Sequence, residues 1–173
     1  AIYKLVETDA LVALSRLFCV GASFHRTLSM SHRQRFSDIA QFFETLQPQS
    51  LSEFKNWYSP DARFKDPCNA VQGVKAIEQI FLHMYESLDN PHFVITGQVV
   101  DGHQAFLTWD FKFRFKRFDT TTQQVVRGTT HLVLDDQMLI TLHRDYWDAA
   151  EELYEKLPWV GGLMRWLKKR ANS

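Results

Sequence analysis

Residues 140–148 carry the side chains of this chain that are best suited to chemistry. Alternate side chains of a β-strand face opposite sides of the sheet. One face of this strand would therefore carry Thr141, His143, Asp145 and Trp147. An imidazole and a carboxylate cost free energy to bury unless they find polar partners. This face is either a solvated surface or the wall of a polar pocket, and the rest of the sequence favours a pocket.

The polar pair on that face has two interpretations. His143 and Asp145 could form a hydrogen-bonded pair that orients the imidazole for proton transfer. Alternatively, Asp145 ties down a helix that follows the strand, or it pairs with Arg144 or Arg127. By the parity of the preceding strand, His131 is expected to point away from the pocket.

A second carboxylate stands where a short strand is expected to end. Residues 62–66 have the composition of a strand, and Pro67 stops it because proline has no N–H to donate to the sheet. Aspartate at such a strand end commonly has a capping or turn role. At the mouth of an apolar cavity, the same carboxylate would be placed to act as a general base. Asp66 is therefore either a turn residue or a pocket base.

The composition is that of a globular chain with a bulky, aromatic interior: 173 residues, 45% hydrophobic and 14% aromatic. Lysine plus arginine number 20, as do aspartate plus glutamate, so no net charge attracts nucleic acid. Cys19 and Cys68 lie far apart without metal-like spacing, which is typical of reduced thiols. No apolar run has the length of a membrane span. We therefore expect a cytoplasmic protein.

Apolar side chains at helical spacing dominate the first half of the chain, followed by a change to period two. Helices are expected at 37–46, 50–58 and 74–88. Ser37 is the expected N-cap of the first, Ser50 and Glu53 form a capping box for the second, and Asn90-Pro91 closes the third.

Strands are expected at 62–66, 93–100, 104–118, 123–134 and 138–147. Strand 104–118 alternates between apolar and largely charged side chains, as in an antiparallel sheet covered on one side. Helices followed by a meander make the fold α+β. The helices should pack on the aromatic face of a curved sheet and leave a cone-shaped cavity. Phe64, Trp109 and Trp147 are expected to line it.

This order of elements, together with the segment 58–67, Gly73 and the closing His-Arg-Asp-Tyr-Trp-Asp, resembles the nuclear transport factor 2-like superfamily over about residues 36–150. Within it, the chain looks like the polyketide-cyclase-like (SnoaL-like) and steroid-isomerase-like branch. The resemblance implies that Asp66 matches the general base of the steroid isomerases. Phe42 and Thr130 stand where those enzymes carry oxyanion-stabilising Tyr and Asp, so steroid isomerisation by that mechanism is not expected.

The closing strand also resembles limonene-epoxide hydrolase, and this likeness implies a catalytic role for Asp145. The Asn that helps hold the attacking water in that family is matched by Asp66. Its Arg and second Asp fall near Trp109 and Phe111, so the triad is incomplete. Polyketide cyclases of this fold use a pocket Asp or His as acid or base, which Asp66, His143 or Asp145 could supply.

Three regions are expected along the chain: an N-terminal extension at 1–29, the domain at 30–150, and a helical tail at 151–173. The apolar side chains of the tail would cover the cavity mouth or a dimer partner, with contact to a membrane surface as the alternative. A homodimer is expected through the outer face of the sheet, where Ile140 and Leu142 would otherwise be exposed.

The sequence thus predicts a small enzyme that acts by acid–base catalysis on an apolar or cyclic molecule and needs neither a metal nor an organic cofactor. The predicted catalytic residues are Asp66, His143 and Asp145. The predicted substrate-binding residues are Phe42, Phe64, Trp109, Thr130 and Trp147. The alternative is a non-catalytic protein that binds a hydrophobic ligand or serves as an assembly module.

Overall fold

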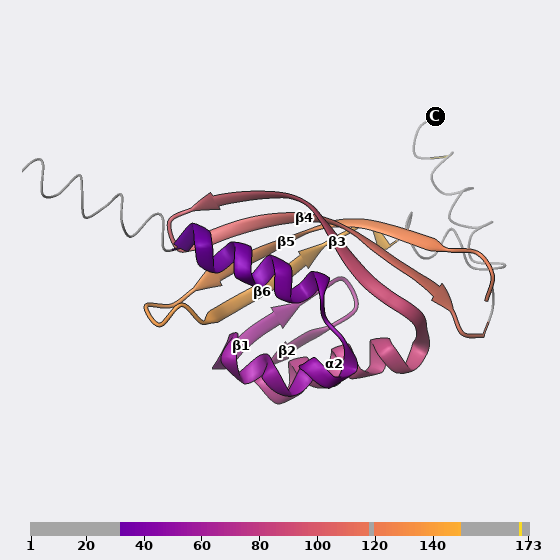
Figure 1. Cartoon of the computed structure of the whole chain (residues 1–173), viewed down its shortest axis with the longest axis horizontal. Coiled ribbons are helices and arrows are strands. Elements are labelled where there is room, and N and C mark those ends of the chain that lie inside the picture. Colours follow the sequence, from indigo (N-terminus) through magenta and orange to yellow (C-terminus); the bar gives the residue numbers. More distant parts are fainter. Residues whose placement is uncertain (1–31, 118–119, 150–169, 171–173) are drawn as a thin grey trace, which may run out of the picture.

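A curved six-stranded sheet carries the fold, and helices lie against one of its faces (Figure 1). The computed structural model describes residues 32–117, 120–149 and 170. The strands are β1 (Tyr58–Lys65), β2 (Ala70–Gln72), β3 (Leu88–Asp101), β4 (Gln104–Phe115), β5 (Gln124–Leu134) and β6 (Ile140–Tyr146). Their order is β2-β1-β6-β5-β4-β3, with β1 parallel to β6 and the other neighbours antiparallel. The predicted α+β class is confirmed.

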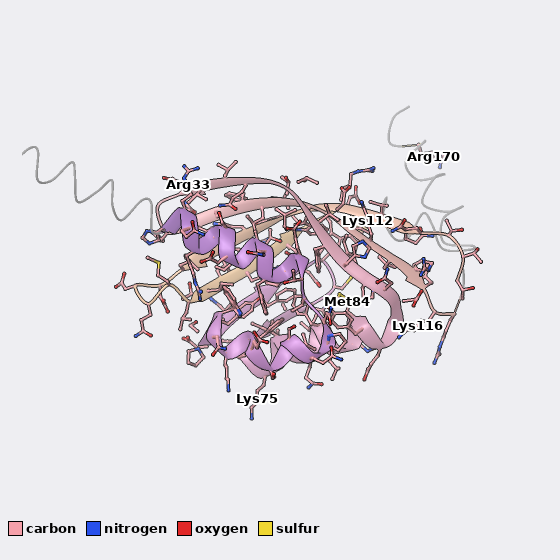
Figure 2. All side chains as sticks on the ribbon, viewed as in Figure 1. Arg33, Lys75, Met84, Lys112, Lys116 and Arg170 are labelled. Carbon is pink, nitrogen blue, oxygen red and sulfur yellow. The ribbon has the colours of Figure 1, made fainter. Side chains whose placement is uncertain are left out.

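Three helical segments accompany the sheet: the first helix at 32–44, the 3₁₀ helix η1 (Pro48–Asn56) and α2 (Val74–Ser87). Side chains fill the space between these segments and the sheet, and in Figure 2 Lys75 of α2 extends away from it. Within the described residues, no helix combines the length and the apolar character needed to cross a membrane. The expected extension at 1–29 and the tail at 151–173 lie outside the described residues, apart from Arg170.

The first helix begins earlier than predicted, and Ser37 is not its N-cap. The hydroxyl of Ser37 donates to the carbonyl of Arg33 one turn before it, as a serine inside a helix commonly does. Phe36 and Ile39, both fully buried, belong to an apolar stripe that continues along this helix. The stripe, rather than the serine, marks the part of the chain that packs on the sheet.

The second predicted helix is a 3₁₀ helix and has no capping box. Its N-cap is Gln47, which makes no side-chain capping bond, and Pro48 begins the segment instead of ending the previous one. The two buried side chains, Leu51 and Phe54, are three residues apart. That spacing suits three residues per turn, so tertiary burial selects the tighter helix.

Strand β1 is longer than predicted at its start. The segment 59–61, which precedes the strand predicted at 62–66, lies inside β1, and the pairing of β1 with β6 shifts register between Tyr58 and Arg63. Such an irregularity admits a proline in a strand because it interrupts the ladder of hydrogen bonds. The short strand β2, which was not predicted, then pairs with the end of β1.

The end of α2 was also placed too late. The helix ends at Ser87 and β3 starts at once, with Asn90 at φ 48° and Pro91 inside the strand. A register shift between Asp89 and His92 accommodates both residues. Asparagine tolerates this left-handed conformation, so Asn90-Pro91 marks a strand irregularity and not a helix end.

The alternation predicted for 104–118 is confirmed in β4, where Leu107 and Trp109 are buried while Phe106 is exposed. The parity prediction for β6 was wrong at its start. Ile140 is fully buried in the core, because the pairing of β5 with β6 shifts register between Ile140 and Leu142. His143 is buried as well, three residues later. Ile140 therefore does not contribute to an exposed outer face.

Candidate functional site

An apolar cavity of about 450 Å³ lies between α2 and the sheet. Met84 of α2, labelled in Figure 2, is one of the residues that line the cavity. Among the described residues, seven aromatic side chains from three strands and the segment after β6 line it: Phe64, Phe93, Trp109, Phe111, Phe113, Phe115 and Trp147. A second, small enclosed space of about 20 Å³ shares some of these walls and is closed by Phe43, Leu107 and His143. Asp145 lines both spaces.

A chain of hydrogen bonds crosses the inner wall from β4 to β6. The indole Nε1 of Trp109 donates to Thr130 Oγ1 over 2.8 Å, and that hydroxyl donates to Asp145 Oδ1 over 2.5 Å. Asp145 Oδ1 also lies 3.0 Å from His143 Nε2. Thr130 and Asp145 are directly paired across β5 and β6, so the sheet register brings them together. His143 and Asp145 thus form the pair that the strand parity predicted.

Tyr58 extends this chain from β1, and sequence reasoning missed it. Its hydroxyl lies 2.6 Å from His143 Nδ1, and the side chain is 1% exposed. Burial, and secondarily the charge of Asp145, raises the pKa of Tyr58 well above its usual range, so its hydroxyl keeps its proton at neutral pH. The parity that Tyr58 shares with Ala62 and Phe64 could have found it, had the strand been extended through Pro60.

These partners fix the tautomer of His143. Tyr58 has no other hydrogen bond within the described residues, so its proton must go to Nδ1 of His143. Nδ1 is then an acceptor, and the ring hydrogen sits on Nε2, where it donates to Asp145. His143 is a neutral imidazole that holds one oxygen of the carboxylate in place.

Gly128 makes room for Trp109. The two residues are directly paired across β4 and β5. A Cβ at Gly128 would lie 2.3 Å from Cη2 of the indole and 2.5 Å from Cζ2. The indole can therefore lie flat over the glycine only while residue 128 has no side chain. Sequence reasoning also missed this residue, although a glycine inside a strand often marks such a close approach.

Asp66 lies at the mouth of the cavity and is held by the loop that joins β1 to β2. Oδ1 accepts from the backbone N–H groups of Cys68 and Asn69 at 2.7 and 2.5 Å. Oδ2 accepts from Asn69 Nδ2 at 2.9 Å. In the described part of the chain, no hydrogen bond joins Asp66 to His143 or Asp145. Its predicted catalytic role stays a prediction, and these contacts favour the turn role.

Of the predicted binding residues, Phe64, Trp109, Thr130 and Trp147 line the two spaces. Phe42 does not. Its ring stacks on Trp57 at 4.7 Å and packs edge-on against Phe54, because one helical step turns it away from the sheet. The neighbouring Phe43 takes the place in the wall that was expected for Phe42.

His131 points away from the cavity, as the strand parity predicted. It stacks on Phe106 at 4.5 Å on the outer face of the sheet and lies within hydrogen-bond distance of Gln104. Burial, and secondarily the charge of Arg144, lowers the pKa of His131. The described residues contain no group of three His, Cys, Asp or Glu side chains arranged to hold a metal ion.

With this geometry in view, the chain was compared with known proteins. The family model of the SnoaL-like domain matches residues 39–143. The chain belongs to the SnoaL-like family. This membership, with the helices on a curved sheet, confirms the predicted nuclear transport factor 2-like fold. No curated protein matched the sequence.

Solved structures of the same fold agree with this assignment. A protein of ketosteroid isomerase-like fold from Catenulispora acidiphila, in complex with trimethylamine, is 18% identical, with a TM-score of 0.58 over 69% of this chain and 88% of that one. A candidate SnoaL-like polyketide cyclase from Jannaschia has 15% identity and a TM-score of 0.59, over 69% and 88%. An epoxide hydrolase from M. tuberculosis, similar to limonene-epoxide hydrolase, is 15% identical in sequence. Its TM-score is 0.54, over 73% of this chain and 86% of that one. At these identities the likeness concerns the fold.

Proposed function

We propose that this SnoaL-like family member is an acid–base enzyme for an apolar, cyclic small molecule, and that Asp145 is its base. One observation carries this proposal. Asp145 Oδ1 is occupied by Thr130 and His143, whereas Oδ2 has no hydrogen-bond partner among the described residues, and the carboxylate lines the cavity. A carboxylate held by one oxygen, whose side chain lines a largely apolar cavity, is arranged to accept a proton.

The reaction would begin when Oδ2 of Asp145 takes a proton from a carbon next to a carbonyl group. The electron pair of the broken C–H bond would form a carbon–carbon double bond, and the π pair of the carbonyl group would move onto its oxygen. The oxygen pair would then re-form the carbonyl group while Asp145 returns the proton to the substrate at the same or another carbon. His143 and Thr130 would be positioning residues, since both donate to Oδ1 and neither needs to touch the substrate. Asp66 remains a candidate for a second acid–base group at the cavity mouth.

The walls support an apolar substrate with ring-shaped surfaces. Aromatic rings offer flat faces, and the space of about 450 Å³ accepts a fused two-ring molecule. Neither lysine nor arginine is among the described residues that line the cavity, so an anionic substrate would find no countercharge. One structure of the same fold holds a small amine, trimethylamine.

The test is hydrogen–deuterium exchange on β-tetralone, an apolar two-ring ketone, followed by proton NMR in D₂O. Exchange does not require that the natural reaction be known. We expect the wild type to accelerate exchange of the hydrogens next to the carbonyl group. In Asp145→Asn, the rate of the catalysed exchange should be about 10²- to 10⁴-fold lower. Asparagine keeps an oxygen acceptor for Thr130 and His143, so the variant is matched in shape.

Asp66→Asn is the second variant in the same assay. If Asp145 is the base, Asp66→Asn should retain most of the acceleration. The reverse result would move the base to Asp66. No acceleration by a wild type that binds β-tetralone would refute the enzyme and support a binding-only protein. The nearly uniform apolar lining of the cavity is the observation in favour of that alternative.

The homodimer stays part of the proposal with different residues, since Ile140 is buried. Val99 and Phe106 are 68% and 41% exposed and pair across β3 and β4, and Tyr146 is 45% exposed. Phe106→Glu should convert a dimer to a monomer in sedimentation velocity. An unchanged sedimentation coefficient would exclude this face.

A cytoplasmic location also remains a proposal, supported by the exposed free thiol of Cys68.

A further inference from the structure

Asp145 is a largely buried carboxylate that forms no ion pair with a lysine or arginine among the described residues. Its side chain is 14% exposed, and its partners Thr130 and His143 are neutral donors. A buried carboxylate is costly unless a positive charge or a full set of hydrogen bonds compensates it. Only one of its two oxygens is compensated by the described residues.

The two arginines expected on sequence grounds to pair with Asp145 contact other side chains. The guanidinium of Arg144 lies over the ring of Tyr146, at 4.8 Å from its centroid. Arg127 reaches Asp110 instead. Both side chains were possible partners of Asp145 on sequence grounds, and neither forms an ion pair with it.

Lys65 lines, together with Arg144, a groove at the ends of β1 and β6. That groove also reaches Asp145, but neither cation is among the residues that line the aromatic cavity. Asp66, at the mouth, adds a second carboxylate to the cavity. The charged groups of the described lining are thus two carboxylates, and His83 is the one further titratable base.

His143 does not supply the missing charge either. The proton of Tyr58 occupies the direction of Nδ1, so a second ring proton on His143 would face another donor. The aromatic rings of Phe43 and Phe64 pack around the imidazole at centroid distances of 5.4 and 4.9 Å, and Tyr58 is the one hydrogen-bond partner of Nδ1 among the described residues. These contacts suit an imidazole with a single ring proton, on Nε2.

The remaining walls suit a positive charge. The π faces of aromatic rings carry negative electrostatic potential and attract cations, most strongly in tryptophan. Trp109 and Phe93 meet edge to face at 5.5 Å in the wall that also contains Asp145. A carboxylate oxygen and aromatic rings therefore converge on the same inner end of the cavity.

We infer that the cavity binds an organic cation: an apolar ring system that carries an ammonium group, with the ammonium against Asp145 and the rings among the aromatic side chains. This inference deepens the proposed function, because it names a class of ligand for the same site, and it rests on that function for Asp145 as the polar group of the cavity. It requires binding alone, so it can hold where turnover is absent.

The test compares two probes of nearly equal size, 1-adamantanamine, which is protonated at neutral pH, and the neutral 1-adamantanol. Their affinities for the full chain are measured by isothermal titration calorimetry at low and at moderate salt. We expect the amine to bind at least about tenfold more tightly. Equal affinities, tighter binding of the alcohol, or no binding of either probe would overturn the inference, and this comparison needs no variant.

Two matched variants locate the charge that the amine recognises. In Asp145→Asn, the affinity for the amine should fall to within about threefold of the affinity for the alcohol. The affinity for the alcohol should stay nearly unchanged. Asp110→Asn removes a carboxylate that pairs with Arg127 on the other face of the sheet, and it should keep the full preference. A preference that survives in folded Asp145→Asn would overturn the inference. Amine preference without β-tetralone exchange would refute the proposed enzyme alone.

Discussion

Replacing Gly128 by alanine tests whether the inner wall of the cavity depends on the absence of one side chain. The new Cβ would approach Cη2, Cζ2 and Cζ3 of the Trp109 indole to 2.3, 2.5 and 2.8 Å. Ordinary contacts between carbon atoms begin near 3.5 Å, so the indole must move by about 1 Å or the strands must separate. Either movement strains the hydrogen bond from Trp109 Nε1 to Thr130 Oγ1.

The expected cost follows from three terms. Overpacking a well-packed wall costs about 1–3 kcal/mol, and losing the indole hydrogen bond costs about 1 kcal/mol. Replacing glycine by alanine also stabilises the folded state by about 0.4–1 kcal/mol, because alanine lowers the conformational entropy of the unfolded chain. Gly128→Ala should therefore lower the free energy of unfolding by about 1–3 kcal/mol. Urea denaturation followed by circular dichroism measures this change. The slope of the free energy of unfolding against urea concentration should be unchanged if unfolding remains two-state.

Two further variants separate the indole from other effects. In a Trp109→Phe background the smaller ring leaves space over residue 128, so most of the cost of Gly128→Ala should disappear. Gly97→Ala is the matched strand glycine, whose Cβ would meet a single atom, Thr108 Oγ1, at 2.8 Å, and its cost should be smaller. If Gly128→Ala stayed within about 0.5 kcal/mol of the wild type, the steric reasoning would be refuted.

Three other predictions concern the core and the buried hydroxyls. Burial raises the pKa of Tyr58, and raises that of Tyr85 to about 12, so above pH about 10 the unfolded chain loses these protons first. The stability that these two groups contribute should be constant below that pH and fall as pH rises towards about 12. The tyrosinate absorbance of the two side chains is obtained as the difference between the wild type and Tyr58→Phe or Tyr85→Phe, and an increase of that difference before unfolding would contradict this. Ile140→Ala should cost about 2–5 kcal/mol in urea denaturation, and Leu142→Ala clearly less. Tyr58→Phe should shift the ring proton of His143 partly from Nε2 to Nδ1 in ¹⁵N NMR, and an unchanged tautomer would remove Tyr58 as its cause.

Some of the site could be predicted because strand alternation is local. Once β6 is recognised, His143 and Asp145 must share a face, since successive side chains of a strand point to opposite sides. The same rule placed Trp109 inside and His131 outside. Helical periodicity places single residues less reliably, because successive side chains of a helix are rotated by about 100°. An error of one residue therefore changes the face, and Phe43 lines the cavity where Phe42 was expected.

The residues that were missed depend on strand irregularities and long-range pairing. A register shift makes the side-chain parity differ on its two sides, and the shift between Ile140 and Leu142 is why Ile140 is in the core and not on the outer face. The interruption within β1 likewise hid Tyr58, because a proline-containing segment is normally a turn. No local pattern reveals that Gly128 is paired with Trp109.

The sequence by itself determined the α+β class, the apolar face of β4 and the side-chain set of β6, because these follow from composition and from the period of two. Tertiary structure alone decided how those side chains are used. The register of β1, β5 and β6 brings Tyr58, His143, Asp145 and Thr130 into one hydrogen-bonded chain. The contacts of Tyr58 with His143 and of Thr130 with Asp145 join segments that are distant in sequence, so no local pattern reveals them. The bonds that hold Asp66 in its own loop are local, but only the folded structure shows that the loop, and not the catalytic pair, holds this carboxylate.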